Sequence, residues 1–244
     1  PSVSSDFTAE ISSDVLSRAI NNTIFATSND ELRPAMTGVY VNLGEKNTTF
    51  VATDGHRLVR YRRTDVKSDN GNAIIIPRKA LNLLKATLPA ENVGVVLNFN
   101  MANAFFRFGN IRMICRLIDE RFPDYENVIP SGNNIKMTIG RNDLLGALKR
   151  ISIYANKTTH QVRLKITGSE LQISAEDLDF SNEANERLSC EHDGEDIEIG
   201  FNAKFLVEML GNMDSEQIRL TMSAPNKAGV ILPAEKDQSE DILM

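Results

Sequence analysis

The sequence predicts an α+β protein in which one unit, made of strands and two helices, is used twice. Short runs of alternating polar and apolar residues recur along the chain and are interrupted by amphipathic stretches of helical period. Landmarks also recur at a nearly constant distance, since Ala52 and Ala175 are 123 residues apart and Leu81 and Leu206 are 125 apart. A period near 125 residues indicates a repeated supersecondary unit.

In the first copy, a helix with a polar N-cap follows the first strand, and a proline opens the second helix. Residues 12–14 (Ser-Ser-Asp) offer capping oxygens to a helix whose apolar face includes Leu16 and Ile20. Pro77 begins the second helix, where its missing N–H costs no hydrogen bond. Strands are expected at 6–11, 38–43, 48–52, 74–76, 93–99, 104–108 and 112–118, with another starting at residue 58.

The second copy repeats this order after a linker. Residues 131–134 read Ser-Gly-Asn-Asn, a composition typical of a connecting segment. Asn142 and Asp143 are expected to cap the first helix of this copy, and apolar residues at 205, 206, 209 and 210 mark the second. Strands are expected at 135–139, 162–166, 171–175, 198–201, 218–223 and 229–232.

A hairpin with an Asp-Gly dipeptide at 54–55 gathers polar side chains at its tip. Asp-Gly between two strand-like runs is typical of a type I′ turn, which needs positive φ at both central residues. Thr53, His56 and Arg57 surround this turn, next to the apolar Leu58. Two interpretations remain open, namely an ordinary solvated tip and the wall of a binding site with one apolar residue at its floor.

Composition excludes several classes of protein. The chain of 244 residues has a net charge of −6, which argues against a protein that grips nucleic acid over its whole surface. Residues 1–130 are nearly neutral, with 15 Lys+Arg against 14 Asp+Glu, whereas residues 131–244 have 12 against 19. No apolar run is long enough to span a membrane. Cys115 and Cys190 have no metal-ligand spacing, so we expect buried thiols, no metal and no cofactor.

Four motifs in order resemble one family. They are ATDGHRL at 52–58, IIIPRKAL at 74–81, RFPDY at 121–125 and IEIGFNAKFL at 197–206. Together they are similar to the bacterial DNA polymerase III beta subunit, the sliding-clamp family, over essentially the whole chain. The resemblance implies tandem DNA-clamp domains, each with β-sheets outside and two α-helices on the inner face.

The resemblance also implies domain boundaries. Residues 1–130 correspond to the middle clamp domain and 131–244 to the C-terminal domain. The family's N-terminal domain is expected to be absent from this sequence, and so are its final apolar strand and Met-Pro-containing tail. The sequence therefore reads as a fragment, and we expect it not to close a ring by itself.

The implied function is a processivity clamp that encircles duplex DNA without reading its sequence. Members of the family are homodimeric rings in the bacterial cytoplasm, associated with the nucleoid, and their helices line the central hole. A sliding ring needs a few weak phosphate contacts rather than a tight grip. The DNA-facing residues implied here are Arg18, Arg78, Lys79, Lys85, Lys149, Arg150 and Lys204, and the dimer-interface residues are Ile153 and Tyr154.

A cleft for partner peptides is implied as well. Its partners in the family include the DNA polymerase III alpha subunit, the clamp loader delta subunit and other proteins that carry a clamp-binding motif. The matching positions are Met36, Thr53, Gly55, His56, Arg57, Leu58, Pro123, Asn127, Val128, Asn202, Phe205, Asn226 and Ala228. We expect Met36, Leu58 and Val128 to act as the main apolar anchors.

Two alternative functions share some of these features. A repeated β/α adaptor that binds peptides but never encircles DNA would use the same cleft residues, and the acidic balance of the chain is compatible with it. Catalysis would rest on Asp54 and His56 alone. No nucleophile elbow, metalloprotease motif or phosphate-binding loop accompanies them, so we expect no enzymatic activity.

Overall fold

The computed structural model describes residues 7–68 and 71–244, and these form two compact units. Unit 1 runs through Tyr125 and includes Asp237–Leu243 from the end of the chain, while unit 2 comprises Glu126–Lys236 and Met244. The division falls five residues before the end of the expected first domain. Residue 6, predicted to begin the first strand, lies outside the described residues.

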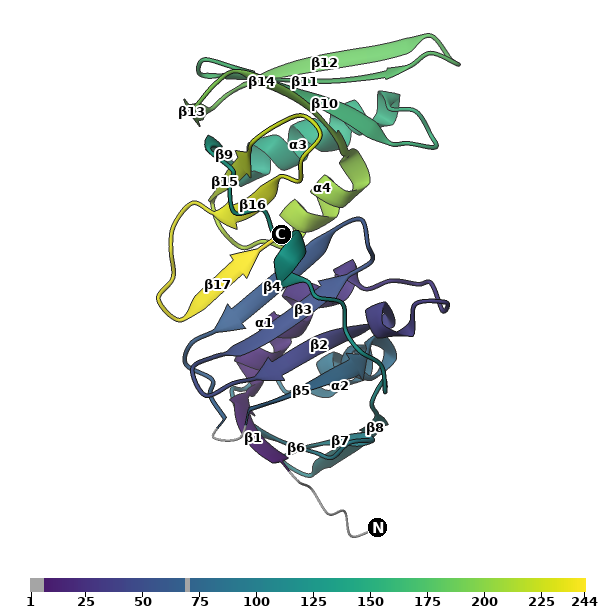
Figure 1. Cartoon of the computed structure of the whole chain (residues 1–244), viewed down its shortest axis with the longest axis vertical. Coiled ribbons are helices and arrows are strands. Elements are labelled where there is room, and N and C mark those ends of the chain that lie inside the picture. Colours follow the sequence, from purple (N-terminus) through teal and green to yellow (C-terminus); the bar gives the residue numbers. More distant parts are fainter. Residues whose placement is uncertain (1–6, 69–70) are drawn as a thin grey trace. The chain divides into compact units, whose positions relative to one another are not determined.

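Unit 1 contains two antiparallel sheets and two helices (Figure 1). One sheet has the order β17-β4-β3-β2-β5 and the other β1-β6-β7-β8. The strands are β1 (Phe7–Ser12), β2 (Gly38–Leu43), β3 (Thr48–Thr53), β4 (Leu58–Arg63), β5 (Asn72–Pro77), β6 (Gly94–Phe99), β7 (Asn103–Phe108), β8 (Ile111–Arg116) and β17 (Glu240–Leu243). Helix α1 (Ser13–Thr23) packs on β1, β3 and β4, and α2 (Arg78–Thr87) packs on β5 and contacts α1.

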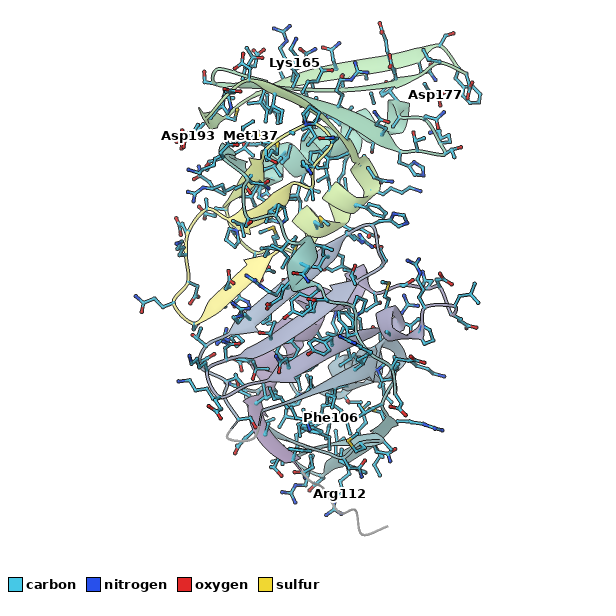
Figure 2. The ribbon with its side chains drawn as sticks, in the orientation of Figure 1. Phe106, Arg112, Met137, Lys165, Asp177 and Asp193 are labelled. Carbon is cyan, nitrogen blue, oxygen red and sulfur yellow. The ribbon has the colours of Figure 1, made fainter. Side chains whose placement is uncertain are left out.

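The core of unit 1 lies between its sheets and helices. Phe106 on β7 is almost fully buried, while Arg112 on β8 is exposed and points away from the unit (Figure 2). Leu16 and Ile20 of α1 are buried, as the helical spacing predicted. Pro77 ends β5 and occupies the N-cap position of α2.

Unit 2 has the same plan. Its sheets have the orders β12-β11-β10-β14 and β13-β9-β15-β16, and α3 (Arg141–Ile151) contacts α4 (Ala203–Gly211). The strands are β9 (Ile135–Gly140), β10 (Gln161–Thr167), β11 (Glu170–Asp177), β12 (Asn182–Ser189), β13 (Glu191–Asp193), β14 (Ile197–Asn202), β15 (Gln217–Met222) and β16 (Val230–Pro233). Met137 of β9 is fully buried, whereas Lys165 of β10 points outward (Figure 2).

The predicted repeat is present in the pairing of the strands. Val39 of β2 lies opposite Ile76 of β5, and Val162 of β10 lies opposite Phe201 of β14. The two pairs are separated by 123 and 125 residues, which matches the period found in the sequence. The fold is therefore α+β with two related units, as predicted.

The N-cap of α1 lies within the predicted residues 12–14, whereas the N-cap of α3 does not lie at the predicted residues 142 and 143. Ser12 is the N-cap of α1 but its side chain makes no capping hydrogen bond. Helix α3 begins at Arg141 after an N-cap at Gly140, so Asn142 and Asp143 lie inside its first turn. A carboxylate in the first turn still interacts favourably with the helix dipole, which explains the misleading signal.

Candidate functional site

The polar hairpin tip is a four-residue loop, Asp54–Arg57, between β3 and β4. Thr53 pairs with Leu58, so the predicted two-residue type I′ turn is wrong. Among the loop residues only Gly55 has positive φ, at 89°. Side-chain oxygens build the loop instead. Asp54 Oδ1 accepts hydrogen bonds from the backbone N–H groups of His56 and Arg57. Thr53 Oγ1 donates a hydrogen bond of 2.7 Å to the Arg57 carbonyl oxygen.

Arg57 is directed into unit 1 rather than out to solvent. Its side chain is 8% exposed, its Nε is 3.2 Å from Asp54 Oδ2, and it donates a hydrogen bond of 2.8 Å to the carbonyl oxygen of Phe25. Its guanidinium carbon also lies 5.4 Å from the centre of the Phe25 ring, within the range of a cation–π contact. Arg57 thus ties the loop to the segment that follows α1.

Leu58 lies half-buried at the edge of an apolar cluster on unit 1. The cluster centres on Val51, Ile75 and Phe122, and Leu58 packs against it together with Ala35, Tyr40, Ile118 and Tyr125. Tyr40 stacks on Phe122 with ring centres 4.9 Å apart. His56 is exposed, and Met36 and Pro123 are half-buried. The hairpin therefore offers an imidazole beside an aromatic and aliphatic surface.

Six predicted cleft residues belong to unit 2 and lie on three segments. Asn127 and Val128 are exposed on a short 3-10 helix, Glu126–Val128, and Asn226 and Ala228 are exposed between β15 and β16. Asn202 is the N-cap of α4, where its Oδ1 accepts from the N–H groups of Lys204 at 3.0 Å and Phe205 at 3.4 Å. The role of Asn202 in the fold is therefore to start α4.

The predicted DNA-facing residues fall into two groups. Lys79, Lys85, Lys149 and Lys204 are exposed on α2, α3 and α4, and Arg78 is half-buried at the start of α2. The two remaining arginines are ion-paired. Arg18 of α1 is 2.7 Å from Glu240 of β17, and Arg150 of α3 donates to both carboxylate oxygens of Glu186 on β12, at 3.0 and 2.6 Å.

The predicted dimer residues lie directly after α3. Ile153 and Tyr154 belong to a short 3-10 helix, Ser152–Tyr154, and these residues are 66% and 43% exposed. Leu178 and Phe180, between β11 and β12, are exposed as well.

Both thiols are free, and Cys190 is buried as expected, whereas Cys115 is only partly buried. Burial raises the pKa of Cys115 to about 11, and burial also raises the pKa of Cys190. Within residues 7–68 and 71–244, no group of His, Cys, Asp and Glu is arranged to hold a metal ion. In the same ranges no helix is long and apolar enough to cross a membrane.

Sequence reasoning missed the residues that restrain the functional side chains. Phe25 holds Arg57, and Arg33 approaches the loop so closely that a Cβ on Gly55 would be 2.7 Å from its Nη1. Glu186 and Glu240 restrain the helix arginines. Phe25, Glu186 and Glu240 are 32, 36 and 222 residues away in the sequence from the arginines that they contact, and only the tertiary structure brings them together.

Two α+β units in tandem, each with two sheets and a pair of adjacent helices, define a clamp-type protein. Residues 10–124 match the family of the central domain of the DNA polymerase III beta subunit, and residues 126–244 match the family of its C-terminal domain. The chain therefore belongs to the DNA polymerase III beta subunit family, the beta sliding clamps.

Relatives of known sequence and structure agree. The chain is 31% identical to the beta sliding clamp of Pseudomonas putida over 97% of its own length, and 30% identical to that of Staphylococcus epidermidis over all of it. It spans 65% of the length of each relative. A crystal structure of the Pseudomonas aeruginosa sliding clamp, bound to griselimycin, superposes with a TM-score of 0.93 at 28% identity and covers 100% of this chain and 67% of that one.

Proposed function

We propose that this chain forms the middle and C-terminal domains of a DNA sliding clamp that encircles duplex DNA as a homodimeric ring. The ring tethers DNA polymerase III and other partners to DNA and has no catalytic activity of its own. The observation that carries the proposal is the match of both units, in order, to two successive domains of one clamp subunit. The domain assignment at 1–130 and 131–244 belongs to the same proposal.

The charges of the helices suit weak contact with DNA. The exposed cations Lys79, Lys85, Lys149 and Lys204 carry flexible side chains, and the net charge of the chain is −6. A protein that neutralises many phosphates loses about 10³–10⁵ in affinity between about 50 and 200 mM salt and is held in one place while bound. A few lysines on an acidic body favour mobile contact, with retention supplied by the closed ring.

Partner docking is proposed for the apolar surface around Leu58 on unit 1. The stacked Tyr40 and Phe122 rings give this surface a rigid floor, and His56 adds a polar group at its margin. Such a mixture suits a short motif with apolar anchors, because a few buried contacts dominate the affinity of such interfaces. The residues of unit 2 named above are proposed to contact the same partners, which include the polymerase alpha subunit and the loader delta subunit.

The exposed Ile153 and Tyr154 support a contact between protomers, and we propose them as part of the ring interface. A clamp acts on replicating DNA, so we propose that the protein is located in the bacterial cytoplasm, associated with the nucleoid. The alternative, a peptide-binding adaptor that never surrounds DNA, would share the Leu58 surface but not the helix cations.

Primer extension tests the proposed function. The protein, expressed from its complete reading frame, is added with a bacterial clamp loader and DNA polymerase III to a primed single-stranded circle, under excess trap DNA so that each polymerase binds once. A clamp lengthens the products of a single binding event. Products of unchanged length would contradict the proposal, and an adaptor would also leave them unchanged.

A further inference from the structure

In both units an arginine on the first helix is held by a glutamate from the edge of the neighbouring sheet. Arg18 of α1 meets Glu240 of β17, and β17 is the terminal strand in the order β17-β4-β3-β2-β5. Arg150 of α3 meets Glu186 of β12, the terminal strand in the order β12-β11-β10-β14. The two glutamates do not occupy equivalent positions of the repeat, so each unit supplies the partner of its arginine from a different strand.

The ion pair between Arg150 and Glu186 is bidentate, which is the strongest arrangement of an arginine and a carboxylate. Two guanidinium nitrogens meet two carboxylate oxygens at 3.0 and 2.6 Å, a parallel pair of charge-assisted hydrogen bonds. The carboxylate of Glu186 faces α3, because side chains alternate along β12 and those of Glu183 and Arg187 lie on the opposite face. The Arg150 guanidinium lowers the pKa of Glu186, so the carboxylate is charged at neutral pH.

Glu240 has more hydrogen-bond partners than Glu186 and is less exposed. Its side chain is 12% exposed, and its carboxylate accepts hydrogen bonds from Arg18 at 2.7 Å, from the Tyr61 hydroxyl at 2.7 Å and from Arg63 at 3.1 Å. Arg63 is paired with Asp65 as well, at 2.6 Å. Glu240 is therefore fixed by the fold of unit 1, and Arg18 is the exposed end of this network.

We propose that Glu186 and Glu240 are positioning residues that restrain Arg150 and Arg18 from gripping DNA phosphate, so that the exposed lysines make the contacts during sliding. This rests on the proposed function. An arginine fork matches a phosphate in two hydrogen bonds at once, whereas a lysine is a point charge with no fixed geometry. A phosphate that approaches a paired arginine also meets the glutamate, and the resulting repulsion keeps the contact weak.

The test is the salt dependence of DNA binding. Affinity for a short fluorescent duplex of random sequence is measured by anisotropy across a salt series, for the wild type and for Glu186→Gln. One released arginine that neutralises one phosphate makes the slope of log affinity against log salt steeper by about 0.9, which is roughly a 3.5-fold extra loss between about 50 and 200 mM. Glu240→Gln is expected to act in the same direction.

Two controls separate this effect from the loss of a negative charge. Glu183→Gln removes the same charge from the other face of β12, and its slope should equal that of the wild type. In the double variant Glu186→Gln with Arg150→Gln, the extra slope should disappear. The Arg150 side chain is 63% exposed, so loss of its pairing with Glu186 should cost the fold little, and thermal melts of all variants verify folding.

Equal slopes for Glu186→Gln and Glu183→Gln would overturn the proposal, as would the absence of duplex binding by every variant. Either result is distinguishable from failure of the proposed function, because retention of the wild type on circular DNA is measured separately. A wild type that stays on circles while the slopes are equal rejects only the restraint by the glutamates. A wild type that is not retained rejects the clamp itself.

Discussion

The Arg57 guanidinium donates a hydrogen bond of 2.8 Å to the Phe25 carbonyl oxygen and lies over the ring of the same residue. This contact joins the hairpin tip of β3 and β4 to the chain that leaves α1. It also turns Arg57 away from solvent, whereas His56 is exposed at the tip and Leu58 lies half-buried at the edge of the apolar cluster. The order of the loop thus depends on a residue 32 positions earlier in the sequence.

We expect Arg57→Ala to lower the free energy of unfolding by about 1–3 kcal/mol, because it leaves the Asp54 carboxylate and the Phe25 carbonyl without this donor. Urea unfolding followed by circular dichroism measures the change. Arg187→Ala is the matched control, since the Arg187–Glu170 pair is exposed and far from the loop in sequence, and it should contribute little. Equal losses for the two variants would show that Arg57 is not the residue that secures the loop.

The docking surface is tested by His56→Ala combined with Leu58→Ala. The double variant should reduce affinity for a fluorescent clamp-motif peptide at least tenfold, because anchor residues usually dominate such contacts. Leu32→Ala is the control, since Leu32 is 91% exposed and lies outside the proposed surface. Unchanged affinity in a folded double variant would remove Leu58 and His56 from the docking site.

Tyr61→Phe tests how β17 is held on unit 1. Tyr61 is fully buried, and burial together with Glu240 raises its pKa above the ordinary range of a tyrosine, so the hydroxyl stays protonated and donates to the carboxylate. Removing this bond to a charged group should cost about 1.5–3 kcal/mol and speed hydrogen exchange of the β17 amides. Tyr154→Phe, at an exposed position, is the control. Exchange that is unchanged in β17 would mean that Tyr61 does not secure the strand.

Cys115 should resist alkylation in the folded protein. Burial raises the pKa of its thiol from 9.0 to about 11, so the thiolate fraction at pH 8 falls roughly a hundredfold relative to an ordinary cysteine. The same shift in the pKa of Cys115 makes the free energy of unfolding depend on pH, because the folded state favours the neutral thiol. The stability that the neutral Cys115 thiol contributes is complete below pH 9 and is lost as the pH rises toward about 11. Iodoacetamide labelling of a Cys190→Ala variant, folded and in urea, measures the rates; equal rates would contradict the prediction.

The strands that bury alternate side chains could be predicted from the sequence, and those at the margins could not. Residues 38–43 were predicted with the bounds that β2 has, because Val39, Val41 and Leu43 face the core. β12 was missed because none of its side chains is fully buried, which leaves no apolar alternation to detect. β17 was missed because it is short and pairs with β4, more than 170 residues earlier.

The candidate site shows the same limit. Its residue types and their order along the chain were visible in motifs such as ATDGHRL, which is local information. The contacts of each side chain could not be predicted from these motifs, because Arg57, Arg18 and Arg150 all meet their partners through the tertiary structure. Local sequence therefore located the hairpin tip but gave no indication that its arginine points inward.

Retention on circular DNA tests the central claim most directly. The protein from its complete reading frame is loaded by a bacterial clamp loader onto nicked circles, freed of unbound protein by gel filtration, and the circles are then cut once with a restriction enzyme. A ring held by topology stays with the intact circle and slides off the cut molecule, so we predict co-elution that is lost on linearisation. Protein that never co-elutes with the circle, or that remains bound after the cut, would contradict encirclement.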